Sequence, residues 1–297
     1  MTSDPTRLTI DRDARGYRYY RNAVERHWDP ADVDLGADAE ALAAADPAVL
    51  DGLRAALGKF GAGEQAVTGD LAPLAQVLDP VEDQLFVTTQ LYEEAKHADF
   101  FDRYWREVIH ETEDAMGLER SSPTDPSWFN EAYDELFERN ERAMARLLED
   151  DTPENRVRAY CHYHLIVEGV LAQTGYYGLT RVFGGEVEES PHLPGLVDGL
   201  NLIRGDEGRH VGFGMAKLKA LVQAGVDPAL IHEVTDDLLA LVQEAVQTPA
   251  DVPEQAQLVD PAELTAYAAE KHAQRLRQIT DADESIPGVE ELTALDA

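Results

Sequence analysis

One spacing of residue types constrains this chain more than any other feature, namely a glutamate followed three residues later by a histidine. In a helix this spacing puts both side chains on the same face, where they can bind the same ion. The pattern occurs four times. Glu94/His97 and Glu207/His210 lie within long segments with substantial apolar neighbours, LFVTTQLYEEAKHADFFDRYW and LNLIRGDEGRHVGFGM. These two pairs are therefore the candidates for a metal site inside a helical core.

The other two occurrences have a different context. Glu107/His110 runs into the polar stretch ETED, and Glu189/His192 contains Pro191 and lies in a break between helices. In a chain with 58 acidic residues a few such pairs arise by chance. Both are therefore expected to be solvent-exposed coincidences.

Two lone glutamates extend the candidate site. Glu168 lies in the apolar stretch HLIVEGVLA, where an acid without a partner is costly to bury. Glu64 is flanked by small residues and is equally compatible with an exposed position. Along the chain a lone Glu precedes Glu-x-x-His, and this order occurs twice, as in the ligand set of ferritin-like two-metal bundles. The candidate metal ligands are thus Glu64, Glu94, His97, Glu168, Glu207 and His210.

The chemistry of these residue types supports the same interpretation. Carboxylates can bridge two cations, and each histidine can give one neutral nitrogen to a different metal, which leaves coordination positions open for oxygen chemistry. A ligating histidine normally donates its other ring N–H to a carboxylate, and Asp206 is the candidate partner of His97. For Asp206 the alternative is an ordinary surface acid. For the whole set the alternative is a bundle whose partly buried acids pair with arginines such as Arg103, Arg204 or Arg209.

The pattern of apolar residues and breaks predicts an all-α fold, because no convincing alternating strand pattern is present. We predict a single ferritin-like domain over 1–297, with a four-helix bundle core at about 55–220 and additional flanking helices. The N-terminal segment (1–38) and the acidic tail (281–297) are expected to be peripheral, and the tail loose. Helices are predicted at 39–58, 61–78, 80–112, 127–149, 153–184, 191–223, 227–247 and 260–280.

Composition narrows the partners and the cellular location. The formal net charge of -33 is spread along the chain and repels polyphosphate backbones, so nucleic acid is not an expected partner. Few lysines beside abundant Asp and Glu favour a halophilic source. The N-terminus does not have the pattern of a signal peptide, and no apolar run approaches the roughly 20 residues that span a bilayer, so a cytoplasmic protein without a membrane span is expected. A single cysteine, Cys161, leaves oxygen and nitrogen as the metal ligands.

Four segments, GEQAVTGDLAPL, LYEEAKHADFF, YCHYHLIVEGVLAQTGYYG and RGDEGRHVGFGM, resemble the small subunit of ribonucleotide reductase, and within that superfamily most closely its ligand-binding oxidases. The resemblance covers roughly residues 55–220. It implies a ferritin-like fold, a homodimer and a mixed manganese/iron site, with di-iron as the alternative. By resemblance, manganese is expected near Glu64, Glu94 and His97 and iron at Glu168, Glu207 and His210, with Glu94 and Glu207 as shared bridges.

Three features favour the oxidases over a reductase subunit. Phe101 occupies the place, one helical turn after the first histidine ligand, where the reductase has its radical tyrosine. The tail DADESIPGVEELTALDA has no aromatic residue, whereas reductase subunits use a tail tyrosine to couple to their large partner. Val67 and Tyr163 match the two residues that the oxidases join by an ether crosslink. The long acidic segment between Glu168 and Glu207 departs from the family pattern and puts access to the site in doubt.

The crosslink expectation meets a geometric difficulty. Val67 lies three residues after Glu64 and shares its helix face. Tyr163 lies five residues before Glu168, which in a regular helix is about 140° from the face of that ligand. A π-bulge between the two would bring them closer to alignment. The alternative is that Val67 belongs to the core and Tyr163 is an ordinary buried phenol.

The leading hypothesis is a dimetal oxidoreductase that acts with dioxygen and binds a long-chain fatty acid or a similar apolar ligand through its carboxylate. The alternatives are a radical-generating small subunit of ribonucleotide reductase and, outside the enzymes, a metal or lipid binding protein. Tyr176 and Cys161 are expected to serve packing, with an approach to the site as the alternative. Six apolar residues are candidates for the pocket, with plain core as the alternative: Leu91, Phe100, Phe101, Val170, Phe213 and Met215.

Overall fold

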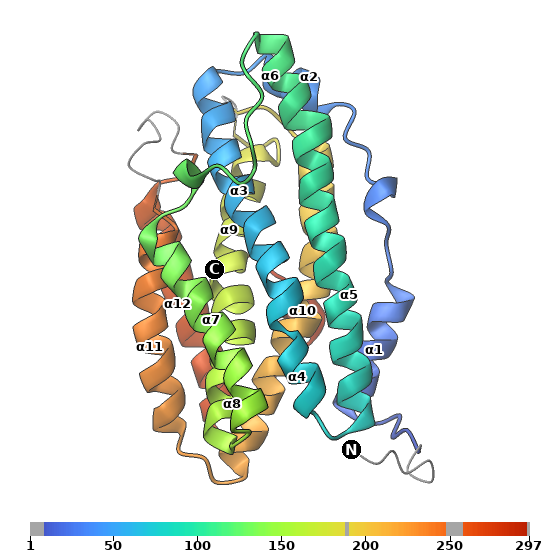
Figure 1. The fold of residues 1–297 in the computed structure, drawn as a ribbon, viewed down its shortest axis with the longest axis vertical. Helices are drawn as coiled ribbons and strands as arrows, with labels where there is room; N and C mark the ends of the chain where they lie inside the picture. Colours follow the sequence, from blue (N-terminus) through green and yellow to red (C-terminus); the bar gives the residue numbers. More distant parts are fainter. Residues whose placement is uncertain (1–8, 188–189, 248–257, 296–297) are drawn as a thin grey trace.

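The computed structural model describes residues 9–187, 190–247 and 258–295, which form a bundle of long helices along the long axis of the molecule (Figure 1). No β-strand occurs among these residues, which confirms the all-α class. The elements are α1 (Arg15–Glu25), η2 (Pro30–Asp32), α2 (Asp38–Ala43), α3 (Pro47–Asp70), α4 (Ala72–Val77), α5 (Val81–Tyr104), η3 (Trp105–Ile109), α6 (His110–Met116), η4 (Pro126–Trp128), α7 (Glu131–Glu149), α8 (Pro153–Tyr160), η5 (Cys161–Ala172), α9 (Gln173–Phe183), α10 (Pro194–Gln223), α11 (Pro228–Ala245), α12 (Pro261–Thr280) and α13 (Val289–Leu292).

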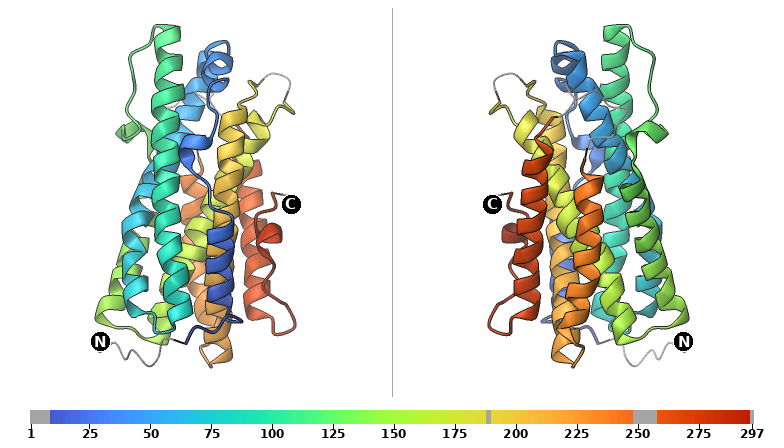
Figure 2. Two further views of the ribbon diagram at one scale, coloured as in Figure 1. Left: turned by 90° about the vertical axis from the view of Figure 1, so that its right-hand side faces the viewer. Right: turned by 90° about the vertical axis from the view of Figure 1, so that its left-hand side faces the viewer.

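Four segments form the core that carries the candidate ligands. α3 packs against α5, α5 against α10, and α10 against η5, which continues α8 and leads into α9. α7 and α11 lie outside this core, and α12 packs against α11 and η5. α1 covers the opposite side, where it packs against α5 and α10 (Figure 2). Among the described helices none combines the length and the apolar character needed to cross a bilayer.

Several helices begin at an aspartate followed by a proline. Asp46, Asp227 and Asp260 each accept a hydrogen bond from a backbone N–H of the first helical turn. The proline that follows each of them has no N–H to leave unpaired, and its fixed φ suits the first turn. These caps therefore set the starts of α3, α11 and α12.

The predicted boundary between helices at 39–58 and 61–78 is wrong. α3 runs without interruption through Gly58 and Gly61. A Cβ at Gly58 would lie 2.9 Å from the ring of Trp128, so this glycine permits close packing and does not end a helix. The breaks lie at the Asp46 cap before α3 and next to Pro73, which falls in the first turn of α4.

A π-helical segment interrupts the helix that carries Glu168. This segment, η5, contains both Tyr163 and Glu168. Hydrogen bonds in a π-helix run between residues five apart, so such residues approach the same face. The π-bulge that the alignment of Tyr163 with Glu168 requires is therefore present.

The two ends of the chain are less peripheral than expected. The tail is not loose where it is described, because α13 packs against α10 and Leu292 is buried. A Cβ at Gly208 of α10 would lie 2.5 Å from Thr293 Cγ2, so this glycine admits the tail. In the N-terminal segment, Trp28 is buried and reaches the interior beside α10.

Candidate metal centre

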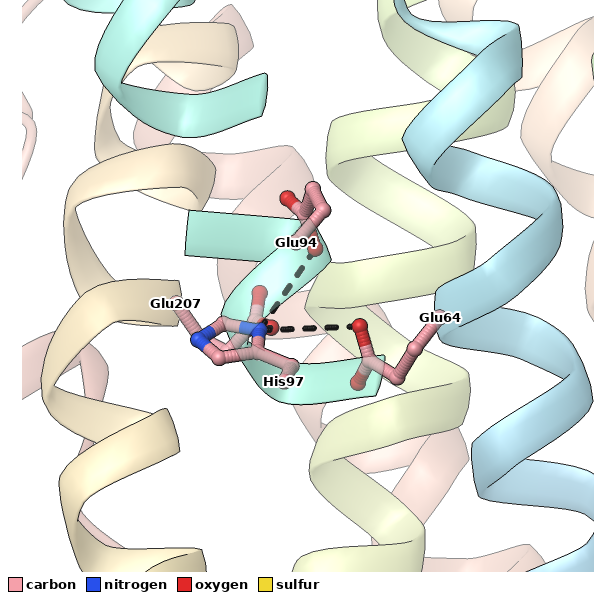
Figure 3. Close-up of side chains that lie close together, drawn as sticks. All are labelled: Glu64, Glu94, His97 and Glu207. Atoms are coloured by element: carbon pink, nitrogen blue, oxygen red, sulfur yellow. Dashed lines mark ion pairs between the residues drawn. The ribbon is translucent and has the colours of Figure 1, made fainter. Parts of the chain in front are cut away.

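The six candidate ligands converge from four elements of the core. Glu64 comes from α3, Glu94 and His97 from α5, Glu168 from η5, and Glu207 and His210 from α10. Glu64, for which an exposed position was equally compatible with the sequence, is 6% exposed. Figure 3 shows the imidazole of His97 facing the carboxylates of Glu64 and Glu94.

The first histidine faces three carboxylates. His97 Nδ1 lies 3.5 Å from Glu64 Oε2, 3.5 Å from Glu94 Oε2 and 3.4 Å from Glu207 Oε1. One potential ligand atom from each of these four residues lies within 4.8 Å of the others. Such a cluster of one nitrogen and three carboxylates has the donor set and spacing for one metal ion.

The second histidine faces a matching set. His210 Nδ1 lies 3.0 Å from Glu94 Oε1, 3.4 Å from Glu168 Oε1 and 3.5 Å from Glu207 Oε2. Glu94 and Glu207 therefore direct one carboxylate oxygen toward each histidine, while Glu64 approaches His97 and Glu168 approaches His210. The geometry is that of two adjacent sites with two shared carboxylates.

The unpaired atoms of the cluster fit metal ions. His97 Nδ1, His210 Nδ1, Glu168 Oε2 and Glu207 Oε2 are buried and have no hydrogen-bond partner. A buried polar atom that has neither a hydrogen-bond partner nor a metal lowers the stability of the folded protein. Two cations between these atoms would satisfy all four, so the residues present fit a dinuclear metal site.

The other ring nitrogen of each histidine is held by an acid. His97 Nε2 donates to Asp206 Oδ2 at 3.1 Å, and His210 Nε2 donates to Glu93 Oε2 at 2.8 Å. A hydrogen bond of this kind fixes the tautomer and leaves the Nδ1 lone pair free for a metal. Asp206 thus lies where the sequence prediction put it, and Arg209 Nη2 contacts both acids.

Asp206 has two further partners. Trp28 Nε1 donates to Asp206 Oδ2 at 2.8 Å, and Lys96 Nζ lies 2.7 Å from the same oxygen. Burial alone would raise the pKa of Asp206, but His97, Arg209 and Lys96 outweigh burial and hold this pKa well below its ordinary value. Asp206 is therefore an anion that orients His97.

Protons compete with cations for the cluster. Burial raises the pKa of Glu64 to about 8, and burial together with the charge of Glu207 also raises the pKa of Glu168. Burial alone would lower the pKa of His97, but its hydrogen bond to Asp206 and the nearby carboxylates of Glu207 and Glu64 raise this pKa well above its ordinary value. Metal binding must therefore displace protons from the site, and affinity depends on pH.

Three aromatic and aliphatic side chains lie beside the carboxylates. Tyr163 donates its phenolic hydrogen to Glu94 Oε1 at 2.8 Å. Val67 is buried one turn after Glu64 on the same helix. Tyr176 Oη lies 3.5 Å from Glu207 Oε1, so this residue reaches the cluster and does not serve packing alone. Cys161 is buried in the apolar core, as expected.

Phe101 is buried one helical turn after His97, and its ring stacks on Phe60 with centroids 5.2 Å apart. Of the two pairs expected to be exposed, Glu107 is exposed and His110 is half-buried against Ser121 O. His192 is exposed, while Glu189 lies outside the described residues.

The alternative in which the buried acids pair with arginines does not hold for the six candidate ligands. Arg103 pairs with Glu107, and Arg209 pairs with Glu93 and Asp206. Arg204 donates to Asn201 and to the backbone oxygen of Thr293. These arginine contacts do not involve the candidate ligands.

An apolar cavity opens onto the carboxylates, but not where it was predicted. None of Leu91, Phe100, Phe101, Val170, Phe213 and Met215 lines it. The cavity is lined instead by a mixture of small residues and other large apolar side chains, among them Phe60, Phe137 and Leu171. Its lining includes Gly52, Ala55, Ala56, Gly63, Val67, Ala172 and Gly175, together with Glu64, Glu94, Glu168 and Glu207 at one end.

Sequence reasoning missed Glu93, Arg209 and Trp28 as contributors to the site. Glu93 and Arg209 each directly precede a ligand, at LYEEAKH and DEGRH, and a charged residue next to a buried ligand is a usable signal. Trp28 has no such signal, because its position depends on how the N-terminal segment packs.

The fold and the cluster together define a class, that of ferritin-like proteins whose carboxylates and histidines fit two metal ions. No protein-family model matches the chain. Solved structures match it closely. A valine-to-leucine variant of an R2-like ligand-binding oxidase, with aerobically reconstituted Mn/Fe cofactor, is 30% identical with a TM-score of 0.80, over 92% of this chain and 96% of that chain.

Two further variants of an R2-like ligand-binding oxidase are similar to this chain to the same degree. A glutamate-to-aspartate variant is 30% identical over 92% of this chain and 96% of that chain, with a TM-score of 0.80. A glycine-to-leucine variant with anaerobically reconstituted Mn/Fe cofactor is 29% identical over 93% and 96%, also with a TM-score of 0.80. The chain belongs to the R2-like ligand-binding oxidases, and it is accordingly an enzyme of the oxidoreductase class.

Proposed function

We propose that this enzyme is a dioxygen-activating oxidase whose six-residue cluster binds one manganese and one iron ion. The observation that carries the proposal is the set of buried, unpaired ligand atoms on His97, His210, Glu168 and Glu207. The Mn/Fe cofactor of the similar solved structures supports the choice of metals. Such a metal pair supplies electrons for the reduction of dioxygen.

Removal of one histidine tests the ligand assignment. His97→Ala or His210→Ala takes away a nitrogen ligand and leaves buried carboxylates without a counter-charge. Bound metal, measured by elemental analysis after loading with manganese and iron, should fall from two equivalents to one or fewer. His110→Ala, which alters a pair outside the cluster, is the matched control and should keep both equivalents. Two equivalents in either ligand variant would overturn the assignment of that histidine.

Manganese is proposed for the site of Glu64, Glu94 and His97, and iron for the site of Glu168, Glu207 and His210. Intrinsic affinity puts manganese below iron for a given ligand set, so differences between the two sites must select it. Metal-specific anomalous diffraction from crystals loaded with both metals without air tests this assignment. Iron alone in both positions would support the di-iron alternative.

The proposed ligand is a long-chain fatty acid or a similar apolar carboxylate. The cavity reaches the glutamates at one end, and on α3 its lining runs from Gly52 to Val67, roughly 22 Å along the helix axis. Ala56→Trp should fill the cavity away from the metals. Mass spectrometry of the extracted protein should then detect less fatty acid than in the wild type, with metal content unchanged.

We also propose an ether bond between Val67 Cβ and the Tyr163 phenol oxygen. Its formation removes the Val67 Cβ hydrogen and the phenolic hydrogen, and dioxygen is the oxidant that takes both electrons and both protons. Peptide mass spectrometry after aerobic loading should find the two peptides joined, with a loss of two hydrogens. Tyr163→Phe should abolish the joined product while the protein still binds both metals.

We propose that the chain forms a homodimer, because the resemblance of its sequence to the ligand-binding oxidases implies one. Light scattering coupled to size-exclusion chromatography should give twice the chain mass of 32.8 kDa. A single chain mass at micromolar concentration would contradict it.

A further inference from the structure

A short chain of buried hydrogen bonds leads away from Glu168. Gln90 Nε2 donates to Glu168 Oε1 at 2.9 Å, and Gln90 Oε1 lies 3.3 Å from His164 Nε2. Gln90 and His164 are fully buried. Neither residue belongs to the candidate ligand set, so their presence in the core needs its own explanation.

The direction of this hydrogen-bond chain follows from the chemistry of its members. A carboxylate that binds a metal is ionised and only accepts hydrogen bonds. In the metal-bound protein the amide nitrogen of Gln90 must therefore face Glu168 and the amide oxygen must face His164. His164 must then carry its proton on Nε2 and donate it to Gln90. Burial lowers the pKa of His164 to about 3, which keeps the ring neutral, and His164 Nδ1 has no partner.

The position of His164 is itself fixed by packing. A Cβ at Gly214 of α10 would lie only 2.2 Å from His164 Cβ, so the backbone of α10 closes directly over this residue. The rings of Tyr163 and Phe213 also border it, at centroid distances of 4.7 Å and 6.0 Å. His164 is therefore packed closely between α10 and the neighbouring rings.

The two lone glutamates, Glu64 and Glu168, differ in how their carboxylates are held. Within the described residues, the carboxylate of Glu168 accepts a hydrogen bond from a side chain that is not a metal-ligand candidate. The carboxylate of Glu64 has no such donor there, and its charged partner is His97 at 3.5 Å. Glu64 and Glu168 both border the cavity, so the difference between them is the hydrogen bond from Gln90. The two metal positions are therefore not equivalent in rigidity.

We propose that Gln90 is a positioning residue that holds the carboxylate of Glu168 in one rotational orientation, and that His164 sets the direction of the Gln90 amide. This inference rests on the proposed metal site. The result is a rigid position at Glu168 and His210 beside a more adaptable position at Glu64 and His97. Two different metals in one cluster require such a difference between positions, because the ligand types at the two positions are the same.

The test is a titration of the metal-free protein with cobalt(II), whose visible absorption reports the geometry of its ligands. The wild type should bind two equivalents. Gln90→Met keeps the side-chain volume but removes the N–H donor, and the affinity of one of the two equivalents should fall about 10- to 100-fold. The absorption band of that equivalent should change, while the other equivalent stays at its wild-type affinity.

His164 provides an independent pair of variants. His164→Leu removes the donor to Gln90 and should weaken the same equivalent of cobalt, whereas His164→Gln retains an N–H donor and should restore the wild-type affinity and spectrum. If Gln90→Met does not fold, this pair decides the question. Equal affinities in His164→Leu and His164→Gln would overturn the proposal.

Asn140→Leu is the matched control for a purely structural effect. Asn140 is a buried amide that donates to Asp70 Oδ2 at 3.0 Å, outside the cluster, so its loss should lower stability and leave both cobalt equivalents unchanged. A folded Gln90→Met protein with wild-type cobalt binding and spectrum refutes the positioning role. Failure of the wild type to bind two equivalents would refute instead the proposed function.

Discussion

Arg209 connects the supports of both histidines. Its guanidinium is fully buried and contacts Glu93, which holds His210, and Asp206, which holds His97. A buried cation between two buried anions offsets charges that would otherwise be very costly in the core. A single side chain therefore contacts the acids that hold both imidazoles.

Arg209→Met should destabilise the metal-free protein by about 3–5 kcal/mol, because it removes the guanidinium that two buried carboxylates share. Denaturant unfolding in the absence of metal measures this change. Arg120→Met is the control, since Arg120 pairs with Asp114 on the surface with both side chains more than half exposed, and it should change stability by less than about 1 kcal/mol. Equal effects of the two substitutions would contradict the role of Arg209.

His162 makes stability depend on pH. Burial, with the charges of Arg139 and Arg158, lowers the pKa of His162 to about 4. The unfolded chain therefore binds a proton below about pH 6.5 that the folded chain does not take up until about pH 4, and stability falls as the pH falls through this window. From pH 7 to 5 this group should cost up to about 2 kcal/mol.

His162→Gln should remove that part of the pH dependence. Urea unfolding at pH 7 and pH 5 gives the difference in the free energy of unfolding, which should be smaller in the variant by up to about 2 kcal/mol. His192→Gln, at an exposed position, is the control. An unchanged difference in His162→Gln would show that His162 does not contribute.

At the scale of elements, η5 explains what the sequence could and could not predict. The order of the lone glutamates and the Glu-x-x-His pairs predicted the four core segments that meet, because helical spacing fixes which side chains share a face. The register of Tyr163 with Glu168 required a π-bulge, and η5 contains it. Gln90 could not be assigned, because its partners Glu168 and His164 lie on a different segment and depend on tertiary packing.

The predicted boundary between helices at 39–58 and 61–78 is wrong because tertiary packing decides what a glycine does in a helix. The range predicted for the first of these helices ended at 58, but α3 continues through Gly58, which admits the ring of Trp128. Small residues along this helix also leave the cavity open, whereas the pocket was predicted from large apolar residues. Composition alone does not distinguish a glycine that ends a helix from one that lets a neighbour approach.

Two glycines of α10 test the close approach of this helix to η5. Gly214→Ala would put a Cβ 2.2 Å from His164 Cβ, so the helices must separate, and stability should fall by about 1–3 kcal/mol or more. Gly205→Ala meets no atom within 4 Å and should stabilise the same helix by about 0.5–1 kcal/mol. Thermal unfolding compares the two variants, and a change of the same sign in both would contradict this packing.

The whole molecule places its charges in two very different settings. Inside, Arg209, Lys96 and the histidines offset the negative charges of Asp206 and Glu93. The ligand glutamates are the residues whose charges metal ions would offset. Outside, most of the net charge of -33 lies on residues that solvent and salt must screen. The interior clusters should therefore respond weakly to salt, and the surface strongly.

The halophilic source that the acidic composition favours predicts that stability rises with salt concentration. Two like charges 10 Å apart in water repel by about 0.4 kcal/mol, and the screening length falls from about 10 Å at 0.1 M salt to about 3 Å at 1 M. Summed over many surface pairs, the gain in the free energy of unfolding should be on the order of 2–5 kcal/mol. Denaturation by urea, which is uncharged, at 0.1, 1 and 2 M potassium chloride measures this gain.

A variant with Asp99→Asn, Glu111→Gln and Asp198→Asn, all at exposed positions, should show a smaller rise in stability with salt. Equal stability of the wild type in dilute buffer and in 2 M salt would count against a halophilic origin, and it would mean that the surface acids lie too far apart to destabilise the fold.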